Sequence, residues 1–445
     1  MHSDENEMMP MEYDKLTAED SKKYILECFV KIREQYLLPV VVQKEISMYL
    51  EMILSTFAKD IKNRLSAAGF HHAQEVLPCE SEIQSMIEHL NSKYLFDKQL
   101  RQYFSFIPPR EKSVRLQAGE VKFQYIFIIE LLQVLLRKEH ILDYVLGRVS
   151  TSNELVMRHP THGSSFQGSF FDVNYPAVQL ILYIDDFEVV NPIGSRRSIH
   201  KLCAIYVTIG NLPLSYNSHL ENIHLLCLFK AHDVTHNKGD FSPFLEPLLT
   251  ELKVLESEGI LVGELHVKAG LMAVTGDNLS SHSLGGFSRN FNHGRICRWC
   301  MAVRSEIGDF KREKMLRLRN METHQYHLKA ALVNTSLGLV YGVKSACPFS
   351  ILQSFQVLEG FPPDIMHDCL EGIVPLTMKL VLKHLIRDKH VTLQKVNAEL
   401  KLLSWGNDNQ YKVQLSDSAT KSRISISWLC HRKMGFVPLS TCSLV

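Results

Sequence analysis

Apolar residues in the first third of the chain recur every three or four positions. The series lie at residues 21–36, 46–61, 83–90 and 126–136. This spacing predicts amphipathic helices. We therefore expect a polar, disordered tail over residues 1–20 and a helical region over 21–149. Nothing in the pattern identifies its function, and a packing or partner-binding role is favoured over specific DNA reading.

The hydrophobic pattern changes near residue 177 from helical spacing to continuous apolar runs. A polar stretch with Ser and Gly, 150–169, is typical of a linker before this change. Bulky apolar residues then dominate four short segments, which are typical of buried strands. These predicted strands lie at 177–184, 202–210, 223–229 and 265–274. An amphipathic helix is predicted at 244–258, between the third and fourth strands.

The order strand, strand, strand, helix, strand predicts the topology of this region. Three strands joined by short turns form an antiparallel meander, and a fourth strand that follows a helix can lie beside the first. This is the plan of an α/β, ribonuclease H-like mixed sheet with flanking helices, and we assign it to residues 170–375. Asp185 ends the first strand and Asp277 follows the fourth. Two such carboxylates can hold Mg²⁺ or Mn²⁺, although acids also follow strands in ordinary solvated turns.

Composition limits the class of protein. The chain has 445 residues, of which 45% are hydrophobic and 22% charged, which indicates a globular protein of two or three domains. The formal net charge of +1 gives no global basic field, so any nucleic-acid surface must be local. No apolar run approaches the roughly 20 residues that cross a bilayer. With an acidic N-terminus and ten irregularly spaced cysteines, we expect an intracellular protein with free thiols and no membrane partner.

A basic segment follows the first predicted strand. Arg196, Arg197 and Lys201 lie just beyond the acidic strand end. They could contact the phosphates of a nucleic acid. The same residues also suit an ordinary solvated hairpin, and the sequence does not separate the two readings.

A C-x-x-C motif, Cys297 to Cys300, lies beyond the fourth strand. Two thiolates at this spacing can bind one zinc ion across a tight turn. A redox pair and two unrelated thiols are the alternatives. We expect structural Zn²⁺, with His324 and His327 completing the site. The candidates for the remaining positions are His324, His327, Cys347 and His367.

Polar residues also cluster after Pro362 and Pro363. Asp364, His367, Asp368 and Glu371 follow at three- and four-residue steps, which places them on one face of a helix. One reading is a helix N-terminus that favours acids. The other is a functional D-x-x-H face near the metal site.

Several short motifs together resemble transposase-derived open reading frames of the CACTA-like group, which are DDE enzymes with a ribonuclease H-like core. The resemblance covers roughly residues 170–385 and depends on five motifs in the family's order. They are 185–194 (DDFEVVNPIG), 211–213 (NLP), 276–278 (GDN) with His282 and 284–286 (LGG), 297–300 (CRWC), and 362–372 (PPDIMHDCLEG).

The resemblance implies roles for particular residues. Asp185 would be the first catalytic acid, Asp277 the second, and Asp364 with His367 the family's D-x-x-H signature. The third acid is expected well downstream, after a helical insertion that we assign to 376–445, and the sequence ends soon after this insertion begins, so we expect a truncated chain. Glu371 is the candidate within reach, with Glu399 the other acid available. Both leave the site incomplete.

Three functions compete at this point. The first is a DDE-type, metal-dependent DNA strand-cleavage or strand-transfer core, catalytically incomplete. The second is a non-enzymatic domesticated transposon protein that binds DNA or protein. The third is a zinc-dependent hydrolase at Cys297 and Cys300. The resemblance further implies DNA as a partner, a nuclear location, and self-association as an additional possibility.

Overall fold

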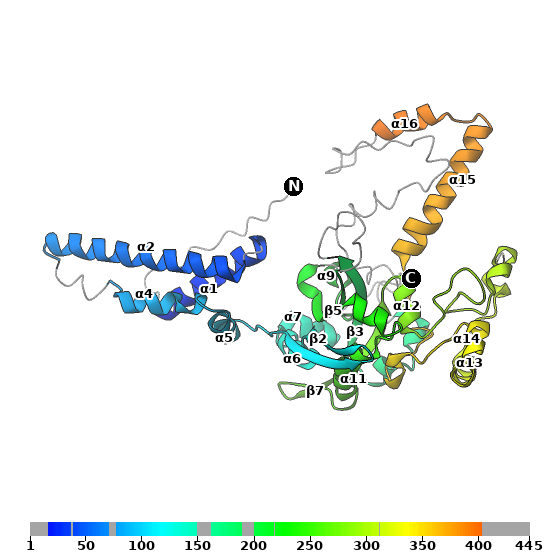
Figure 1. The fold of residues 1–445 in the computed structure, drawn as a ribbon, viewed down its shortest axis with the longest axis horizontal. Helices are drawn as coiled ribbons and strands as arrows, with labels where there is room; N and C mark the ends of the chain where they lie inside the picture. The colour runs from blue at the N-terminus through cyan, green and yellow to red at the C-terminus, as the bar shows by residue number, and fades with distance from the viewer. Residues whose placement is uncertain are drawn as a thin grey trace. The chain divides into compact units, whose positions relative to one another are not determined.

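The computed structural model divides the chain into two compact units that meet between Pro108 and Pro109 (Figure 1). The residues it describes are 17–36, 39–70, 77–148, 162–188, 200–217, 219–310 and 312–402. Most of the expected tail over 1–20, most of the expected linker over 150–169, and residues 403–445 of the expected insertion lie outside these ranges. Each unit is described by itself.

Unit 1, up to Pro108, is helical over its described residues, as the apolar spacing predicts. Its elements are α1 (Ala18–Tyr36), α2 (Val40–Ala67), α4 (Glu80–Ile87), the 3₁₀ turn η2 (Glu88–Leu90) and α5 (Lys93–Tyr103). Leu26, Ile87 and Leu90 are fully buried at the centre of the core, and Phe96 adds a ring from α5. The helices are therefore held by one shared apolar cluster.

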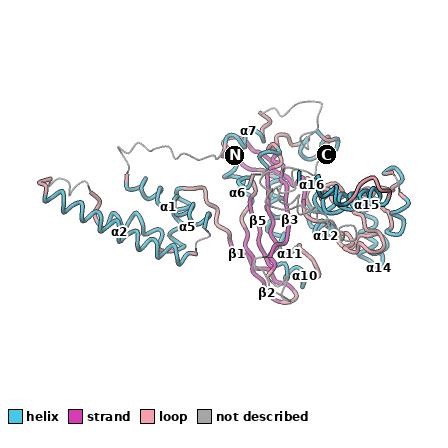
Figure 2. Tube along the Cα trace, turned by 90° about the horizontal axis from the view of Figure 1, so that it is seen from above, coloured by secondary structure: helices cyan, strands magenta, loops and turns pink. Residues whose placement is uncertain are grey.

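Unit 2, from Pro109, contains a seven-stranded mixed sheet in the order β1-β2-β5-β4-β3-β7-β6. Figure 2 shows these strands side by side. The strands are β1 (Arg110–Leu116), β2 (Gly119–Tyr125), β3 (Ala177–Glu188), β4 (Lys201–Ile209), β5 (His224–Lys230), β6 (Ile260–Val262) and β7 (Leu265–Thr275). The predicted mixed α/β class is confirmed.

The middle of the sheet is built from the four predicted strands. β3, β4 and β5 form an antiparallel meander, and β7 pairs with β3 in parallel. The first eight residues of β3 are buried apart from Tyr183, which is half-buried. A strand covered on both faces explains the unbroken apolar run in the sequence. This pairing brings the ends of β3 and β7 to the same edge of the sheet.

Helices cover the sheet and extend beyond it. They are α6 (Ile128–Leu135), α7 (Glu139–Val145), α8 (Phe170–Val173), α9 (Leu214–Asn217), α10 (Ala231–His236), α11 (Ser242–Ser257), α12 (Asn278–Leu284), α13 (Met321–Val333), α14 (Thr335–Tyr341), α15 (Val374–Arg387) and α16 (Leu393–Leu402). On α11, Phe244 contacts Phe123 of β2 and Phe229 of β5. Among the described helices, none is both long and apolar enough to span a lipid bilayer.

The expected helical region over 21–149 differs from the structure at residues 110–125. These residues form the β1–β2 hairpin, and β2 pairs with β5, so the hairpin belongs to the sheet. Buried Glu251 of α11 secures this addition by accepting hydrogen bonds from the Tyr125 hydroxyl (2.6 Å) and from the amide of Ile128 (3.2 Å). The division between the two compact units therefore lies at residue 108 and not at the expected linker.

Candidate functional site

The two predicted acids lie just beyond the paired stretch of two neighbouring parallel strands. Tyr183 of β3 is paired with Thr275 of β7, the last register pair between them. Asp185 and Asp277 each lie two residues beyond this pair. Because paired positions of parallel strands advance together, both carboxylates reach the same edge of the sheet.

Close contact between the two strands continues past the register pair. The Thr275 hydroxyl donates to the carbonyl of Leu182 over 2.9 Å. At Gly276, a Cβ atom would lie 2.8 Å from the carbonyl oxygen of Ile184, a distance that real Cβ atoms essentially never show. Only glycine permits this approach without a shift of the backbone. Gly276 therefore allows Asp277 to follow β7 so near to β3.

The adjacent acids Asp185 and Asp186 do not share a role, because successive side chains of a strand point to opposite faces. Asp185 accepts a hydrogen bond from the Tyr183 hydroxyl over 2.8 Å. A carboxylate oxygen of Asp186 lies 3.5 Å from the amino group of Lys201. Burial raises the pKa of the Cys203 thiol, and the negative charge of Asp186 raises it further. Asp185 is thus the acid that faces Asp277.

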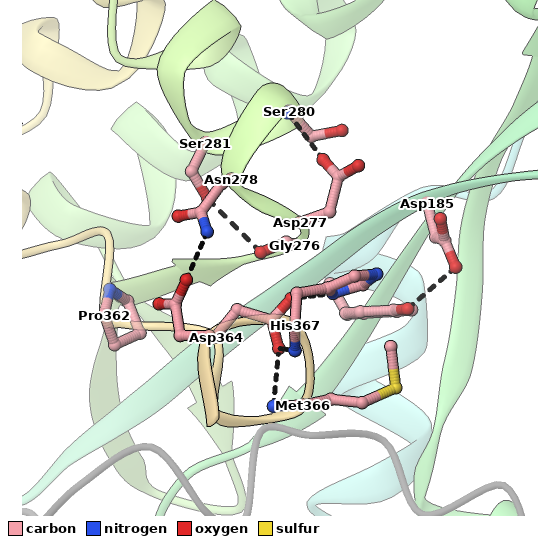
Figure 3. Close-up of polar contacts among 12 residues, drawn as sticks. Asp185, Gly276, Asp277, Asn278, Ser280, Ser281, Pro362, Asp364, Met366 and His367 are labelled. Carbon is pink, nitrogen blue, oxygen red and sulfur yellow. Dashed lines mark hydrogen bonds and ion pairs between the residues drawn. The ribbon is translucent and has the colours of Figure 1, made fainter. Parts of the chain in front are cut away.

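Asp277 also begins helix α12. Its Oδ1 accepts a hydrogen bond from the amide of Ser280 over 2.6 Å, so the side chain caps the helix. This bond fixes the carboxylate and leaves lone pairs on both oxygens for other ligands. Figure 3 shows Asp277 above the segment that carries His367.

The segment before helix α15 brings the third predicted group to the same place. The amide of Val274 in β7 donates to the carbonyl of Gly360 over 2.8 Å, which anchors this segment beside the strand. Asp364 is buried, and its Oδ1 accepts from the amide of Met366 over 3.0 Å. Its Oδ2 bonds to Nδ1 of His367. The predicted D-x-x-H pair is therefore one hydrogen-bonded unit.

These three backbone segments line a small hollow that is open to solvent. Its lining residues are Tyr183, Asp185, Thr275, Gly276, Asp277, Pro362, Pro363, Asp364 and His367. Burial raises the pKa of Tyr183, and the charges of Asp185, Asp364 and Asp277 raise it further. The three carboxylates therefore converge on one small volume. Within the described ranges, however, no three His, Cys, Asp or Glu side chains form a group that could hold a metal ion.

The buried Arg298 links the backbone segments that line the hollow. It donates to the carbonyls of Phe361 (3.3 Å) and Pro362 (3.0 Å), and to Oδ1 of Asn278 (2.7 Å). Asn278 in turn donates to Asp368. Arg298 thus joins the C-x-x-C segment to the residues on either side of the site. We did not predict this role from the sequence, where the one indication was that Arg298 lies inside the motif at 297–300.

Tyr183 was not predicted either. It lies two positions before Asp185 and therefore on the same face of β3.

The expectation that Asp364, His367, Asp368 and Glu371 share one helical face is wrong in part. The chain forms a π-helix over Met366–Ile373 before α15. Asp364 precedes it, and Asp368 bonds to Asn278. Glu371 is exposed, and its charge raises the pKa of His367, but it does not line the hollow. The i to i+5 bonding of a π-helix changes which residues share a face.

Of the three residues predicted to contact nucleic acid, the structure describes only Lys201. This residue begins β4 and pairs with Asp186, outside the lining of the hollow. Arg196 and Arg197 lie outside the described residues.

The C-x-x-C motif and the two predicted histidines lie around one buried arginine. Arg319 donates to the carbonyl of Cys297 over 3.2 Å. Burial, together with the positive charge of Arg319, lowers the pKa of His324 to about 4. Burial raises the pKa of Cys300, and its neighbour Cys297 raises it further. The four expected ligands, Cys297, Cys300, His324 and His327, therefore share a neighbourhood but do not form a closed metal-binding group.

Two buried imidazole nitrogen atoms in this neighbourhood lack hydrogen-bond partners, as does Nη1 of Arg319. Nδ1 of His324 and Nδ1 of His327 have no hydrogen-bond partner among the described residues. An unpaired buried polar atom costs about 1–3 kcal/mol. A neutral imidazole nitrogen is also a zinc ligand. The donor set thus fits Zn²⁺ chemically. The alternative ligand Cys347 is a buried thiol at the start of the 3₁₀ turn η8 (Pro348–Ile351).

The pH dependence of His367 gives a first prediction. Its hydrogen bond to Asp364 raises its pKa above 6.5, so the folded state favours the charged imidazolium. This contribution to stability is fully present below pH 6.5 and is lost as the pH rises through the raised pKa. A titration of the His367 ring by NMR should give a value above 6.5, and Asp364→Asn should lower it. An equal value in both proteins would contradict the pairing.

Comparison with known proteins adds no assignment: no protein-family model matches the chain, and no curated protein is significantly similar to it.

Proposed function

We propose that unit 2 is a ribonuclease H-like core of the DDE transposase lineage, whose Asp185 and Asp277 bind Mg²⁺ or Mn²⁺ for phosphodiester chemistry on DNA in the nucleus. The observation that carries the proposal is that each of these two acids lies two residues past the last pair between the parallel strands β3 and β7, and that both line one hollow. The strand order β5-β4-β3-β7 supports it, since a meander followed by a parallel strand is the plan of that fold.

The residues of the hollow suit a hard divalent cation. Mg²⁺ is commonly held by one or two carboxylates and keeps several waters, so Asp185 and Asp277 suffice as protein ligands. A bound ion would polarise the phosphate and activate the attacking water or 3′-hydroxyl. Tyr183 orients Asp185, and the Ser280 amide orients Asp277. His367, whose hydrogen bond to Asp364 favours its protonated form, can contact a phosphate oxygen or exchange a proton at Nε2.

The third acid decides between an enzyme and a binding protein. Glu371 is exposed and does not line the hollow, and Glu399, the other acid considered from the sequence, belongs to α16. Loss of a metal-binding carboxylate costs orders of magnitude in rate because the ions lose their fixed geometry. The proposed activity is accordingly incomplete. The alternative, a non-enzymatic protein that retains the fold to bind DNA or protein, is favoured by the position of Glu371.

A cleavage assay separates these two functions. The full chain is incubated with labelled DNA and Mn²⁺, beside Asp185→Ala and Asp277→Ala. Residual cleavage that both substitutions abolish would establish the enzyme. DNA binding without cleavage would establish the alternative. Cleavage that is unchanged in both variants would refute the assignment of the two acids.

We further propose a structural Zn²⁺ bound by Cys297, Cys300, His324 and His327. The support is the neighbouring thiols of Cys297 and Cys300 and the two unpartnered Nδ1 atoms, both of which lie near Arg319. The purified protein should contain about one zinc per chain, and Cys297→Ser should lose it and unfold at a lower temperature, because metal binding contributes to folding. Cys79→Ser, which changes an exposed thiol of unit 1, is the control. Zinc-free protein with the same melting temperature would exclude the site.

A further inference from the structure

A large segment of unit 2 leaves the fold and returns to it at one place. This segment, residues 285–347, connects α12 to the turn η8. The amide of Lys344 donates to the carbonyl of Gly286 over 2.7 Å, and the amide of Ser288 donates to the carbonyl of Gly342 over 3.0 Å. The two ends of the segment therefore lie side by side.

The segment is strongly basic. It contains eleven Lys and Arg residues but four Asp and Glu residues, a net charge of +7, whereas the whole chain has a formal net charge of +1. The rest of the chain is therefore net acidic. A segment with such an excess of one sign creates a local field that attracts anions. We call residues 285–347 the basic lobe.

Seven bases of the basic lobe have exposed side chains that keep their charge unpaired. The ion pairs found among the described residues involve none of these seven. The acids of the lobe whose side chains are described and exposed are Glu306, Asp309 and Glu322. Positive charge therefore dominates the described surface of the lobe. The seven bases are Arg289, Arg304, Arg312, Lys314, Arg317, Lys329 and Lys344.

Several arginines of the basic lobe gather near His327 of α13. Burial lowers the pKa of His327, and the positive charges of Arg319, Arg295 and Arg317 lower it further. Like charges at short range repel one another. Arg295 and Arg319 donate hydrogen bonds to backbone carbonyl groups, whereas Arg317 is exposed. An anion bound at Arg317 would therefore offset the repulsion.

The basic lobe adjoins the candidate site. Asp277 caps α12, and this helix has seven residues, so the lobe begins about 10 Å along the chain from Asp277. Within the lobe, Arg298 donates to the carbonyl of Pro362, a lining residue of the hollow, over 3.0 Å. Figures 1 and 2 show α14 of the lobe on the same side of the sheet as α12. The positive surface and the hollow therefore belong to adjoining parts of unit 2.

We propose that the basic lobe binds the phosphate backbone of duplex DNA and holds the substrate at the hollow. This inference rests on the proposed function and names the surface that such a function needs. The carboxylates of the hollow repel phosphates, so the attraction for DNA must come from elsewhere. Seven of the eleven bases are arginines, whose planar fork of donors matches a phosphate group. The adjoining hollow favours DNA over an acidic polypeptide, which has no phosphodiester bond.

Fluorescence anisotropy with the full chain and a labelled 30-base-pair DNA duplex tests the inference. The buffer contains neither chelator nor added divalent metal. Each phosphate contact contributes about −0.9 to the slope of log K against log salt concentration. Contacts from about four of the exposed bases predict a slope of about −3.6, so affinity should fall on the order of 100-fold between 50 and 200 mM NaCl.

A triple variant, Arg312→Gln/Lys314→Gln/Arg317→Gln, removes three neighbouring exposed bases of the lobe. Its affinity at 100 mM NaCl should be at least about tenfold lower than that of the parent, and its salt slope should be shallower by about 2. Lys329→Gln, a single change on α13, should make the slope shallower by about 1. Circular dichroism should show that every variant keeps the parent helix content.

The matched control is Lys44→Gln/Lys59→Gln/Lys93→Gln. It changes the net charge equally through three exposed lysines of unit 1 and leaves every base of the lobe in place. Its DNA affinity should differ from that of the parent by less than about twofold. An equal loss in the control and in the lobe variants would show a general charge effect and would overturn the inference.

Two further results would also overturn it. One is a parent chain that fails to bind the duplex at 50 mM NaCl. The other is poly-glutamate that competes as well as unlabelled DNA at equal charge concentration, which would assign the lobe to an acidic polypeptide. Because the assay contains no Mg²⁺ or Mn²⁺, a hollow that fails to bind these ions would refute the proposed function without changing this result.

Discussion

Replacing Arg298 by alanine should destabilise unit 2 by about 3 kcal/mol. Its guanidinium is buried and makes three hydrogen bonds, to Phe361, Pro362 and Asn278. The substitution leaves their oxygen atoms unpaired, and each buried unpaired group costs about 1–3 kcal/mol. Calorimetric unfolding of the full chain measures the effect. Arg298→Lys should fall between parent and alanine variant, because an ammonium cannot reproduce the fork of donors.

The same substitution should also weaken divalent-metal binding. Arg298 holds the segment that carries Asp364 and His367, so we assign it a positioning role. Mn²⁺ titration at a temperature where the variant remains folded separates this role from a purely structural one. Arg295→Ala is the matched control, since Arg295 lies in the same segment and donates one hydrogen bond, to Val340. Unchanged Mn²⁺ affinity in Arg298→Ala would reduce its role to stability alone.

Replacing Asp277 by asparagine should weaken Mn²⁺ binding by about 100-fold. Loss of groups that only support a metal ligand already costs about 10–100-fold in affinity, and Asp277 is proposed to bind the ion itself. The substitution preserves the fold, because an asparagine oxygen can still accept the hydrogen bond from Ser280 and cap α12. Asp185→Asn should have a comparable effect. Isothermal titration with Mn²⁺ provides the measurement.

Asp186→Asn is the control for both acids. Asp186 neighbours Asp185 in sequence but lies on the other face of β3, where it pairs with Lys201. Its replacement should change Mn²⁺ affinity less than twofold. Equal losses of Mn²⁺ affinity in Asp186→Asn and Asp185→Asn would indicate a general charge effect. Unchanged Mn²⁺ affinity in Asp277→Asn would show that Asp277 does not bind the ion.

The sequence predicted the middle of the sheet because its signals are local. Long apolar runs identify strands such as β3, and the helix between β5 and β7 requires a crossover that returns the chain to the first strand. The acids at the ends of β3 and β7 follow from that topology. The meeting of Asp185 and Asp277 at one edge was thus accessible without coordinates, whereas the close approach at Gly276 was not.

Other features depend on contacts that no local pattern encodes. The β1–β2 hairpin alternates in burial, but its outward residues are charged and its apolar content is low, so residues 110–125 did not read as strands. The π-helix over Met366–Ile373 separates Glu371 from Asp364, although simple helical spacing joins them. Arg298 is charged, and its burial follows only from the carbonyl groups that surround it.

A crystal structure of the full chain soaked in Mn²⁺ tests the shared metal site most directly. The account predicts an anomalous peak in the hollow, with a carboxylate oxygen of Asp185 and one of Asp277 each about 2–2.3 Å from the ion. Carboxylates separated by more than about 8 Å, which is farther than two ions 3.5–4 Å apart can bridge, or a hollow without manganese at saturating concentration, would contradict it.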